Sequence, residues 1–215
     1  MHILIVPGFL GHPGEVAFKE LKATLEGKGS QVIELAWPHF ADNLSKYSFR
    51  ETIAYARRVI TDLRSRDLAI LGFSMGGIIA TVLASEFQPT KLGLIVSPYH
   101  VGNEEDLAGK YRDWQTTGYR DVISSMHGQL RVPFSFVEDA QRYNALDYID
   151  RVDCPVLFVV GEKDDKNPLA VTRKLFEKAN EPKDWHEIPG MQHRYQYQSQ
   201  AMLETVNRLL VDFIG

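Results

Sequence analysis

The sequence predicts an α/β fold, with one parallel β-sheet covered by helices on both faces. Short apolar runs of strand length alternate along the chain with longer segments in which apolar residues recur at helical spacing. Parallel strands need crossover connections, and here the crossovers are the helices, which then cover the sheet. The chain has 215 residues, a length that one domain accommodates, so we expect a single domain over residues 1–215.

Six apolar runs are predicted as strands. They lie at 2–6, 31–36, 68–72, 92–97, 155–160 and 184–188. The predicted helices run from after Gly14 to about 26, then over 49–66, 78–84, 168–179 and 199–214. We expect Asn167 as the N-cap and Pro168 as the first residue of the fourth helix, because those positions favour these residue types. The segment 37–48 has no periodic pattern and is expected to be irregular.

Residues 98–153, called the insertion below, interrupt this alternation with a polar and aromatic stretch that has no clear buried strand. Helices are predicted around 104–117, 119–128 and 138–149. A long insertion without core strands is typical of a lid or a binding segment. The alternative is a surface excursion that packs over one edge of the sheet. The aromatic residues that are candidates to line a pocket are Tyr99, Tyr111, Trp114, Tyr119, Phe134, Phe136 and Tyr143.

The composition excludes several classes of protein. The net charge is −4 and no basic block occurs, so neither nucleic acid nor a membrane is expected as a partner. The first residues, MHILIVPGF, lack the basic region of a signal peptide, and no run reaches the about 18 apolar residues of a membrane span. We therefore expect a cytoplasmic protein. Whether it is a monomer or a homodimer is left open.

The stretch from Asp67 to Ala84 reads as a strand, a glycine turn and a helix. The turn, Gly72-Phe73-Ser74-Met75-Gly76, has the pattern G-x-S-x-G. In such a turn the serine takes a strained backbone conformation that projects its hydroxyl above the sheet, beside the N–H groups that open the helix. Ser74 is therefore the candidate nucleophile. The alternative is a plain glycine turn between a strand and a helix.

A serine hydroxyl becomes a good nucleophile when a base takes its proton and a second group orients that base. Asp164 follows the fifth predicted strand and His193 follows the sixth, each in a loop that a glycine opens. The active sites of open α/β sheets lie at these carboxyl ends of strands. Asp164 and His193 are therefore the candidate acid and base. Asp165 is a rival for the acid, and either aspartate could be an ordinary turn residue.

Metal and thiol chemistry are not predicted. The remaining histidines show no H-E-x-x-H or other metal-ligand spacing; they are His2, His12, His39, His100, His127 and His186. The single cysteine, Cys154, is expected to be a small buried residue at the start of a strand, and it has no partner for an internal disulfide. We assign no metal and no cofactor.

The motifs together resemble the α/β-hydrolase superfamily. GFSMGG matches the nucleophile turn, GEKDDKNP the acid loop and GMQH the histidine loop, in the order Ser74, Asp164, His193 that this superfamily uses. The likeness covers nearly the whole chain outside the insertion. Within the superfamily, the insertion and the segment DCPVLFVVGEKD are most similar to small intracellular carboxylesterases.

This resemblance implies an α/β-hydrolase fold with a shortened, six-stranded parallel sheet in the order 2-1-3-4-5-6 and a helical lid in the insertion. The superfamily's first two strands are expected to be absent. It also implies an oxyanion hole, formed by the backbone N–H groups of Phe9 and Met75. One departure is Pro7-Gly8, which stands where the family usually has His-Gly.

The function expected from the sequence is hydrolysis of a carboxylic ester with a small to medium apolar or aromatic group, through an acyl-enzyme. Thioesters, amides, lactones and acyl transfer would use the same residues. A second class is nucleotide binding by the loop PGFLGHPGE, but its glycines do not follow G-x-G-x-x-G. A third is a catalytically silent hydrolase fold that binds a ligand or partner. The sequence cannot choose the substrate, because specificity lies in loops and in the lid.

Overall fold

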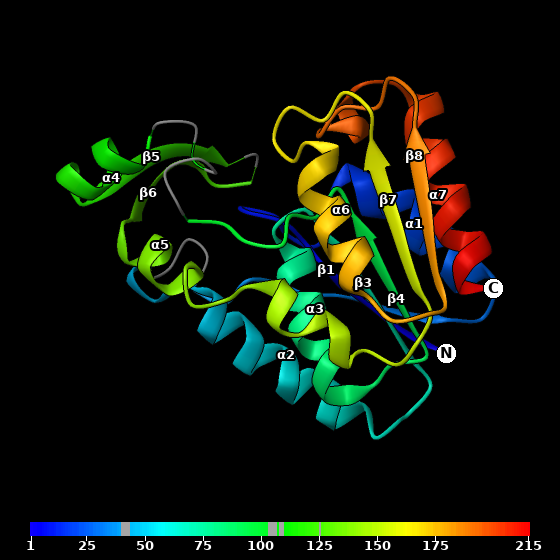
Figure 1. Ribbon diagram of the computed structural model, residues 1–215. Helices are drawn as coiled ribbons and strands as arrows, with labels where there is room; N and C mark the ends of the chain where they lie inside the picture. Colours follow the sequence, from blue (N-terminus) through cyan, green and yellow to red (C-terminus); the bar gives the residue numbers. More distant parts are fainter. Residues whose placement is uncertain (40–43, 103–106, 108–109, 125) are drawn as a thin grey trace.

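The computed structural model describes residues 1–39, 44–102, 107, 110–124 and 126–215, and its centre is a six-stranded parallel sheet (Figure 1). The strands follow the order β2-β1-β3-β4-β7-β8, and every neighbouring pair is parallel. Their bounds are β1 (His2–Val6), β2 (Gln31–Glu34), β3 (Leu68–Phe73), β4 (Lys91–Ile95), β7 (Val156–Gly161) and β8 (Lys183–Ile188). The predicted fold class and strand order are confirmed.

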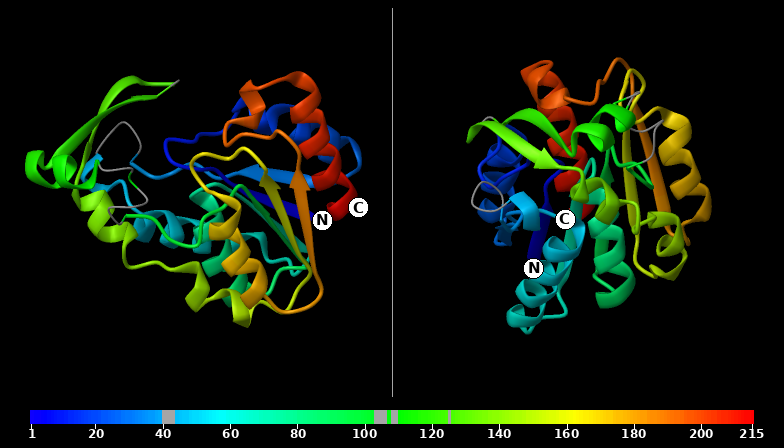
Figure 2. Two further views of the ribbon diagram at one scale, coloured as in Figure 1. Left: turned by 45° about the horizontal axis from the view of Figure 1, so that its top comes forward. Right: turned by 90° about the vertical axis from the view of Figure 1, so that its left-hand side faces the viewer.

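Helices cover both faces of the sheet (Figures 1 and 2). One face carries α1 (Val16–Gly27) and α7 (Gln200–Ile214), whereas the other carries α2 (Phe49–Leu63), α3 (Gly76–Phe87) and α6 (Leu169–Lys178). Alternate residues of a strand pack against the helices on opposite faces of the sheet. In β1, Leu4 and Val6 pack on the α3 side, and Ile3 and Ile5 pack on the α1 side. All four are fully buried.

Two of the helices begin at serine caps that fix where the chain turns. The Ser48 hydroxyl accepts a hydrogen bond from the Glu51 N–H at the start of α2, and Ser199 does the same for Met202 in α7. The expected cap of α6 is wrong, because its N-cap is Pro168 and the helix begins at Leu169. The Asn167 amide instead donates to the carbonyl of Val96, and so ties the acid loop to the segment after β4.

The insertion combines helices with an antiparallel hairpin. Its elements are α4 (Tyr111–Thr117), β5 (Tyr119–Ser124), β6 (Gly128–Pro133), α5 (Ser135–Ala140) and the single turns η2 (Ala145–Asp147) and η3 (Ile149–Arg151). The helix predicted around 119–128 is therefore wrong, since these residues form β5 and the turn to β6. Exposed and half-buried side chains alternate along β5, which is a strand pattern. Of the helix predicted at 104–117, residues 104–106 and 108–109 lie outside the described residues, as do 40–43 of the irregular segment.

The hairpin β5–β6 stands away from the main sheet, as Figure 2 shows, and reaches over the region where strands β3, β7 and β8 end. Because the main sheet is parallel, the loops that follow these strands meet at one edge. Ser74, Asp164 and His193 all lie in those loops. Among the described helices, none has the length and apolar character needed to cross a bilayer.

Candidate active site

Ser74 lies in the turn between β3 and α3 in a left-handed conformation, with φ of 51°. Such a conformation is strained for a residue with a side chain and recurs at functional sites. The neighbouring glycines allow the backbone segments around the turn to lie very close together. A Cβ atom added to Gly76 would lie only 2.3 Å from the carbonyl oxygen of Val6. A Cβ on Gly8, in the loop after β1, would lie 3.2 Å from the Cβ of Ser74. The glycines therefore let two loops meet at the serine.

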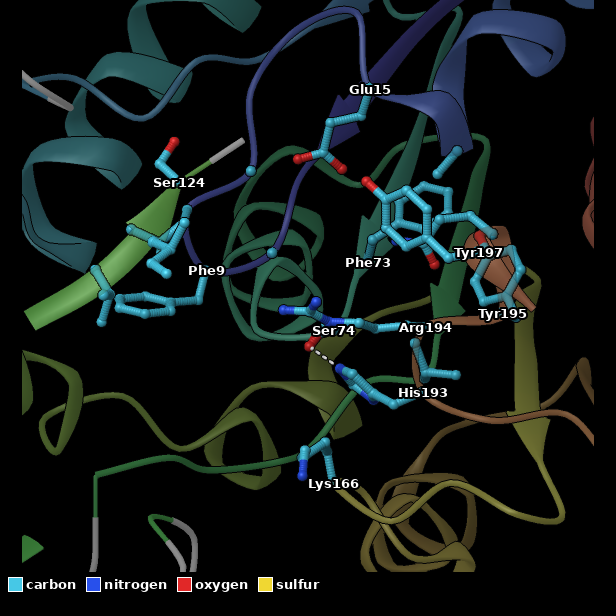
Figure 3. A pocket seen from close by; sticks show the side chains of 18 of the residues that line it. Phe9, Glu15, Phe73, Ser74, Ser124, Lys166, His193, Arg194, Tyr195 and Tyr197 are labelled. Carbon is cyan, nitrogen blue, oxygen red and sulfur yellow. Dashed lines mark hydrogen bonds between the residues drawn. The ribbon is translucent and has the colours of Figure 1, made fainter. Parts of the chain in front are cut away.

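The structure brings Ser74, His193 and Asp164 into one hydrogen-bonded chain. Ser74 Oγ lies 2.9 Å from His193 Nε2, the contact drawn as a dashed line in Figure 3. On the far side of the ring, His193 Nδ1 lies 3.0 Å from Asp164 Oδ2 and 3.1 Å from Oδ1. These residues are separated by 119 and 29 positions in sequence, so only the parallel sheet brings them together.

The acid loop distinguishes the two adjacent aspartates. Asp164 is buried, with 6% of its surface exposed, and its Oδ1 accepts the N–H groups of Lys166 and Asn167, both at 2.9 Å. These bonds fix the carboxylate against His193. Asp165 is exposed and pairs with the Lys166 ammonium, which lowers the pKa of the Asp165 carboxyl. The structure therefore places Asp164, and not its neighbour, against the imidazole.

The loop after β1 carries Phe9, which lines the same cleft as Ser74. Met75 is the N-cap of α3. Its backbone N–H is one of the donors at the start of the helix that have no carbonyl acceptor within the helix.

Two aromatic side chains from outside the loop after β1 hold that loop in place. The Trp37 indole donates to the Pro7 carbonyl at 3.0 Å, and the Leu10 N–H donates to the Tyr47 hydroxyl at 3.0 Å. Both aromatic residues are buried. Sequence reasoning missed both residues, since the segment that carries them has no periodic pattern.

A cleft of about 970 Å³ opens beside Ser74 and His193. One wall is strand β5 from Arg120 to Ser124, and the other includes the loop from His193 to Tyr197. In Figure 3, Phe9 and Ser124 lie to one side of Ser74, and Tyr195 and Tyr197 lie to the other. The cleft is therefore bounded on one side by the insertion and on the other by loops of the main sheet.

A second, apolar pocket of about 70 Å³ lies behind Phe9 and Met75. The insertion closes it with Trp114 and Phe136, each 3% exposed. Tyr143 lines neither cavity and stacks on Phe49 with ring centroids 5.7 Å apart. Of the aromatic candidates from the sequence, Trp114 and Phe136 thus line a pocket next to the serine.

Metal ligands and reactive thiols do not accompany this site in the described part of the chain. No group of three or more His, Cys, Asp or Glu side chains there could hold a metal ion. Cys154 is buried two residues before β7, and burial raises the pKa of its thiol to about 11.

Solved structures share this fold over nearly the whole chain. The ferulic acid complex of Est1E from Butyrivibrio proteoclasticus is 18% identical with a TM-score of 0.75, and 99% of this chain and 89% of that one are covered. A monoacylglycerol lipase from Paleococcus ferrophilus is 18% identical with a TM-score of 0.78, covering 99% and 93%. The mouse alpha/beta hydrolase domain-containing protein 10 is 20% identical with a TM-score of 0.78, covering 99% and 89%. At this identity the likeness describes the fold alone.

Sequence comparison agrees with the fold. An uncharacterised protein of Mycobacterium tuberculosis is 24% identical over 211 residues, which cover 94% of this chain and 68% of the relative. The model of the alpha/beta hydrolase family matches residues 3–207. That match spans the Ser74 turn, the acid loop and the histidine loop, and it confirms the superfamily predicted from those motifs. The chain therefore belongs to the alpha/beta hydrolase family.

Proposed function

We propose that the protein is a serine hydrolase that cleaves a carboxylic ester through an acyl-enzyme, with Ser74 as nucleophile, His193 as base and Asp164 as the group that orients His193. The observation that carries this proposal is the hydrogen-bonded chain from Ser74 Oγ through His193 to Asp164, with distances of 2.9 and 3.0 Å. These are the contacts that proton transfer from a serine hydroxyl requires.

In the first half of the reaction, Ser74 Oγ attacks the carbonyl carbon while His193 Nε2 takes the hydroxyl proton. Asp164 accepts the Nδ1–H of His193, which keeps Nε2 free as the base and stabilises the imidazolium. The backbone N–H groups of Phe9 and Met75 would hold the oxyanion that forms on the carbonyl oxygen. His193 then protonates the leaving oxygen. A water molecule, activated by the same imidazole, releases the acyl group and restores the serine.

The apolar pocket behind Phe9 and Met75 suits the acyl group. Phe9 and Met75, whose N–H groups would hold the carbonyl oxygen, also line this pocket, so it offers an apolar site beside the reacting carbonyl. This pocket is small, with about 70 Å³ against about 970 Å³ for the large cleft. We therefore propose a short apolar acyl chain of a few carbon atoms as the preferred group.

The test is a panel of 4-nitrophenyl esters of increasing acyl length, assayed with the wild-type protein and with Ser74→Ala. We expect kcat/KM to be highest for short chains and to fall for long ones, and Ser74→Ala to be inactive while keeping its circular dichroism spectrum and Tm. A Ser74→Ala protein with a near-wild-type rate would contradict the serine mechanism. A wild-type protein that hydrolyses no ester, thioester or amide would favour a silent binding protein.

A further inference from the structure

The charged side chains that line the large cleft are more basic than the protein as a whole, whose net charge is −4. The basic members are Arg120, Lys166 and Arg194, and the acidic members are Glu15 and Asp121. A concave site with an excess of one charge focuses its field and attracts ligands of the opposite charge. Lys166 is paired with Asp165, so Arg120 and Arg194 are the cationic side chains of this lining that can attract an anionic ligand.

The two carboxylates of this lining are occupied elsewhere. Asp121 lies opposite Arg131 in the hairpin and accepts from its Nε at 2.9 Å, a bond that lowers the pKa of the Asp121 carboxyl. Glu15 accepts the His12 N–H at 3.0 Å, and burial raises the pKa of its carboxyl. The charge of Arg194 acts on Glu15, so these two groups offset each other in part. Neither carboxylate pairs with Arg120.

Arg120 is the basic residue best placed to bind a ligand. It lies half-buried in β5 and lines both the large cleft and the small apolar pocket. Its guanidinium carbon lies 5.6 Å from the centroid of the Trp114 ring, a contact that orients the group. Within the described residues, its guanidinium makes no ion pair and no hydrogen bond. An oriented, unpaired guanidinium suits a carboxylate, which it can bind through two parallel N–H bonds.

The proposed mechanism decides which part of the substrate meets this cleft. His193 must protonate the leaving oxygen, so the leaving group lies on the His193 side of the carbonyl carbon. His193 lines the large cleft but not the small pocket behind Phe9 and Met75. We therefore place the acyl chain in the small pocket and the leaving group in the large cleft, and Arg120, which borders both cavities, lies where it can meet the leaving group.

We propose that the leaving group of the substrate carries a carboxylate, and that Arg120 binds this carboxylate. This rests on the ester hydrolysis proposed above for Ser74. In the acylation step, Ser74 Oγ forms an ester with the acyl group, and the bond between the carbonyl carbon and the leaving oxygen breaks. The leaving oxygen takes the proton held by His193. The products over one turnover are a short apolar carboxylic acid and an anionic hydroxy acid.

The test compares two acetate esters that differ in one carboxylate on the leaving group: 4-nitrophenyl acetate and 3-carboxy-4-nitrophenyl acetate. Each enzymatic rate is divided by the rate of spontaneous hydrolysis, to remove the difference in chemical reactivity. We expect the wild-type kcat/KM to favour the carboxylated ester by about tenfold, as one charge-assisted contact allows. Added salt should reduce this preference, because it screens the attraction.

Arg120→Gln should abolish the preference, and Arg120→Lys should keep part of it, since lysine keeps the charge but not the paired N–H geometry. The matched control is Arg142→Gln, an exposed arginine of the insertion that lines neither cavity. This variant should keep the wild-type ratio of kcat/KM for the two acetate esters. The folding of each variant is checked by its Tm and by titration with a fluorophosphonate.

Equal wild-type rates on the two esters, or an unchanged ratio in Arg120→Gln, would overturn the proposal and leave ester hydrolysis standing. A preference for 4-nitrophenyl hemisuccinate over 4-nitrophenyl butyrate, without one for the carboxylated phenol, would move the carboxylate to the acyl side and overturn it too. If neither ester reacts, the proposed function fails. The role of Arg120 is then tested by calorimetry, which compares the binding of 5-hydroxy-2-nitrobenzoate and of 4-nitrophenol to the wild-type protein. Equal or weaker binding of the carboxylated phenol would overturn the role of Arg120.

Discussion

The two sides of the reaction centre are built in different ways. On one side, Ser74, His193 and Asp164 contact each other through their own side chains, at the ends of three strands. On the other, the groups facing the carbonyl would be backbone N–H groups, and the loop that carries Phe9 is positioned by the buried side chains of Trp37 and Tyr47. Substitutions on the first side should remove chemistry, whereas substitutions on the second should misplace an intact group.

The largest difference is expected on the triad side. Asp164→Asn should lower kcat by about 10⁴-fold, because the amide no longer holds His193 in the tautomer that leaves Nε2 free. Asp165→Asn, one residue away, is the control and should stay near the wild-type rate, since Asp165 is exposed and pairs with Lys166. Steady-state kinetics of both variants on one short ester measure this. A large loss of kcat in Asp165→Asn, with a near-wild-type kcat in Asp164→Asn, would show that the acid is assigned to the wrong residue.

A smaller effect is expected on the loop side. Tyr47→Phe removes the acceptor of the Leu10 N–H and should lower kcat roughly 10- to 100-fold by loosening the oxyanion loop. KM should change little, because the site that binds the substrate is otherwise intact. The control is Tyr55→Phe, a half-buried tyrosine of α2 that lines neither cavity. A loss of Tm without loss of kcat in Tyr47→Phe would mean that Tyr47 serves stability alone.

The same contrast explains what the sequence predicts. The four inner strands β1, β3, β4 and β7 are predictable because they are apolar and buried on both faces, and β3 and β7 have no exposed residue. The turn around Ser74 and the loops of Asp164 and His193 are predictable because their glycines and their place after strands leave a pattern. Trp37 and Tyr47 leave none, since a single contact to a loop follows no period. Their roles depend on where the chain returns in space.

The hairpin β5–β6 escaped sequence analysis for a related reason. Its strands face the cleft and solvent, so no apolar run marks them, and charged residues such as Asp121 and Arg131 occupy paired positions instead. Such a cross-strand ion pair is visible only when the register is known. Because Arg120 lies in β5, the sequence analysis did not identify it either, although the proposed choice of leaving group depends on it.

The comparison extends to the acyl pocket, where effects should appear as changes in preference. Trp114→Ala and Phe136→Ala enlarge the small pocket and should shift the ratio of kcat/KM for a bulky over a short acyl ester by about tenfold. Tyr143→Ala is the matched control from the insertion, because it lines neither cavity. If Trp114→Ala and Phe136→Ala both keep the wild-type ratio, as the control does, the pocket does not hold the acyl chain, and the insertion is better explained as packing or an oligomer contact.

The smallest effect is expected from the thiol. Because burial raises the pKa of Cys154 to about 11, the thiol stays protonated near neutral pH, and the thiolate that reacts with iodoacetamide is scarce. Reactivity should increase only as the pH rises toward that value. Treatment with iodoacetamide near neutral pH, and the Cys154→Ala substitution, should both leave ester hydrolysis unchanged. Inhibition by the reagent that Cys154→Ala abolishes would point to a role for the thiol that the serine mechanism does not contain.

The most direct test of the central claim is the site at which a fluorophosphonate reacts. The wild-type protein is treated with the probe, its intact mass is measured, and the modified peptide is sequenced by mass spectrometry. The proposed mechanism predicts one adduct, on Ser74, that is absent from Ser74→Ala and forms much more slowly in His193→Ala. An adduct on another residue, or ester hydrolysis that continues in a protein whose Ser74 is fully modified, would contradict it.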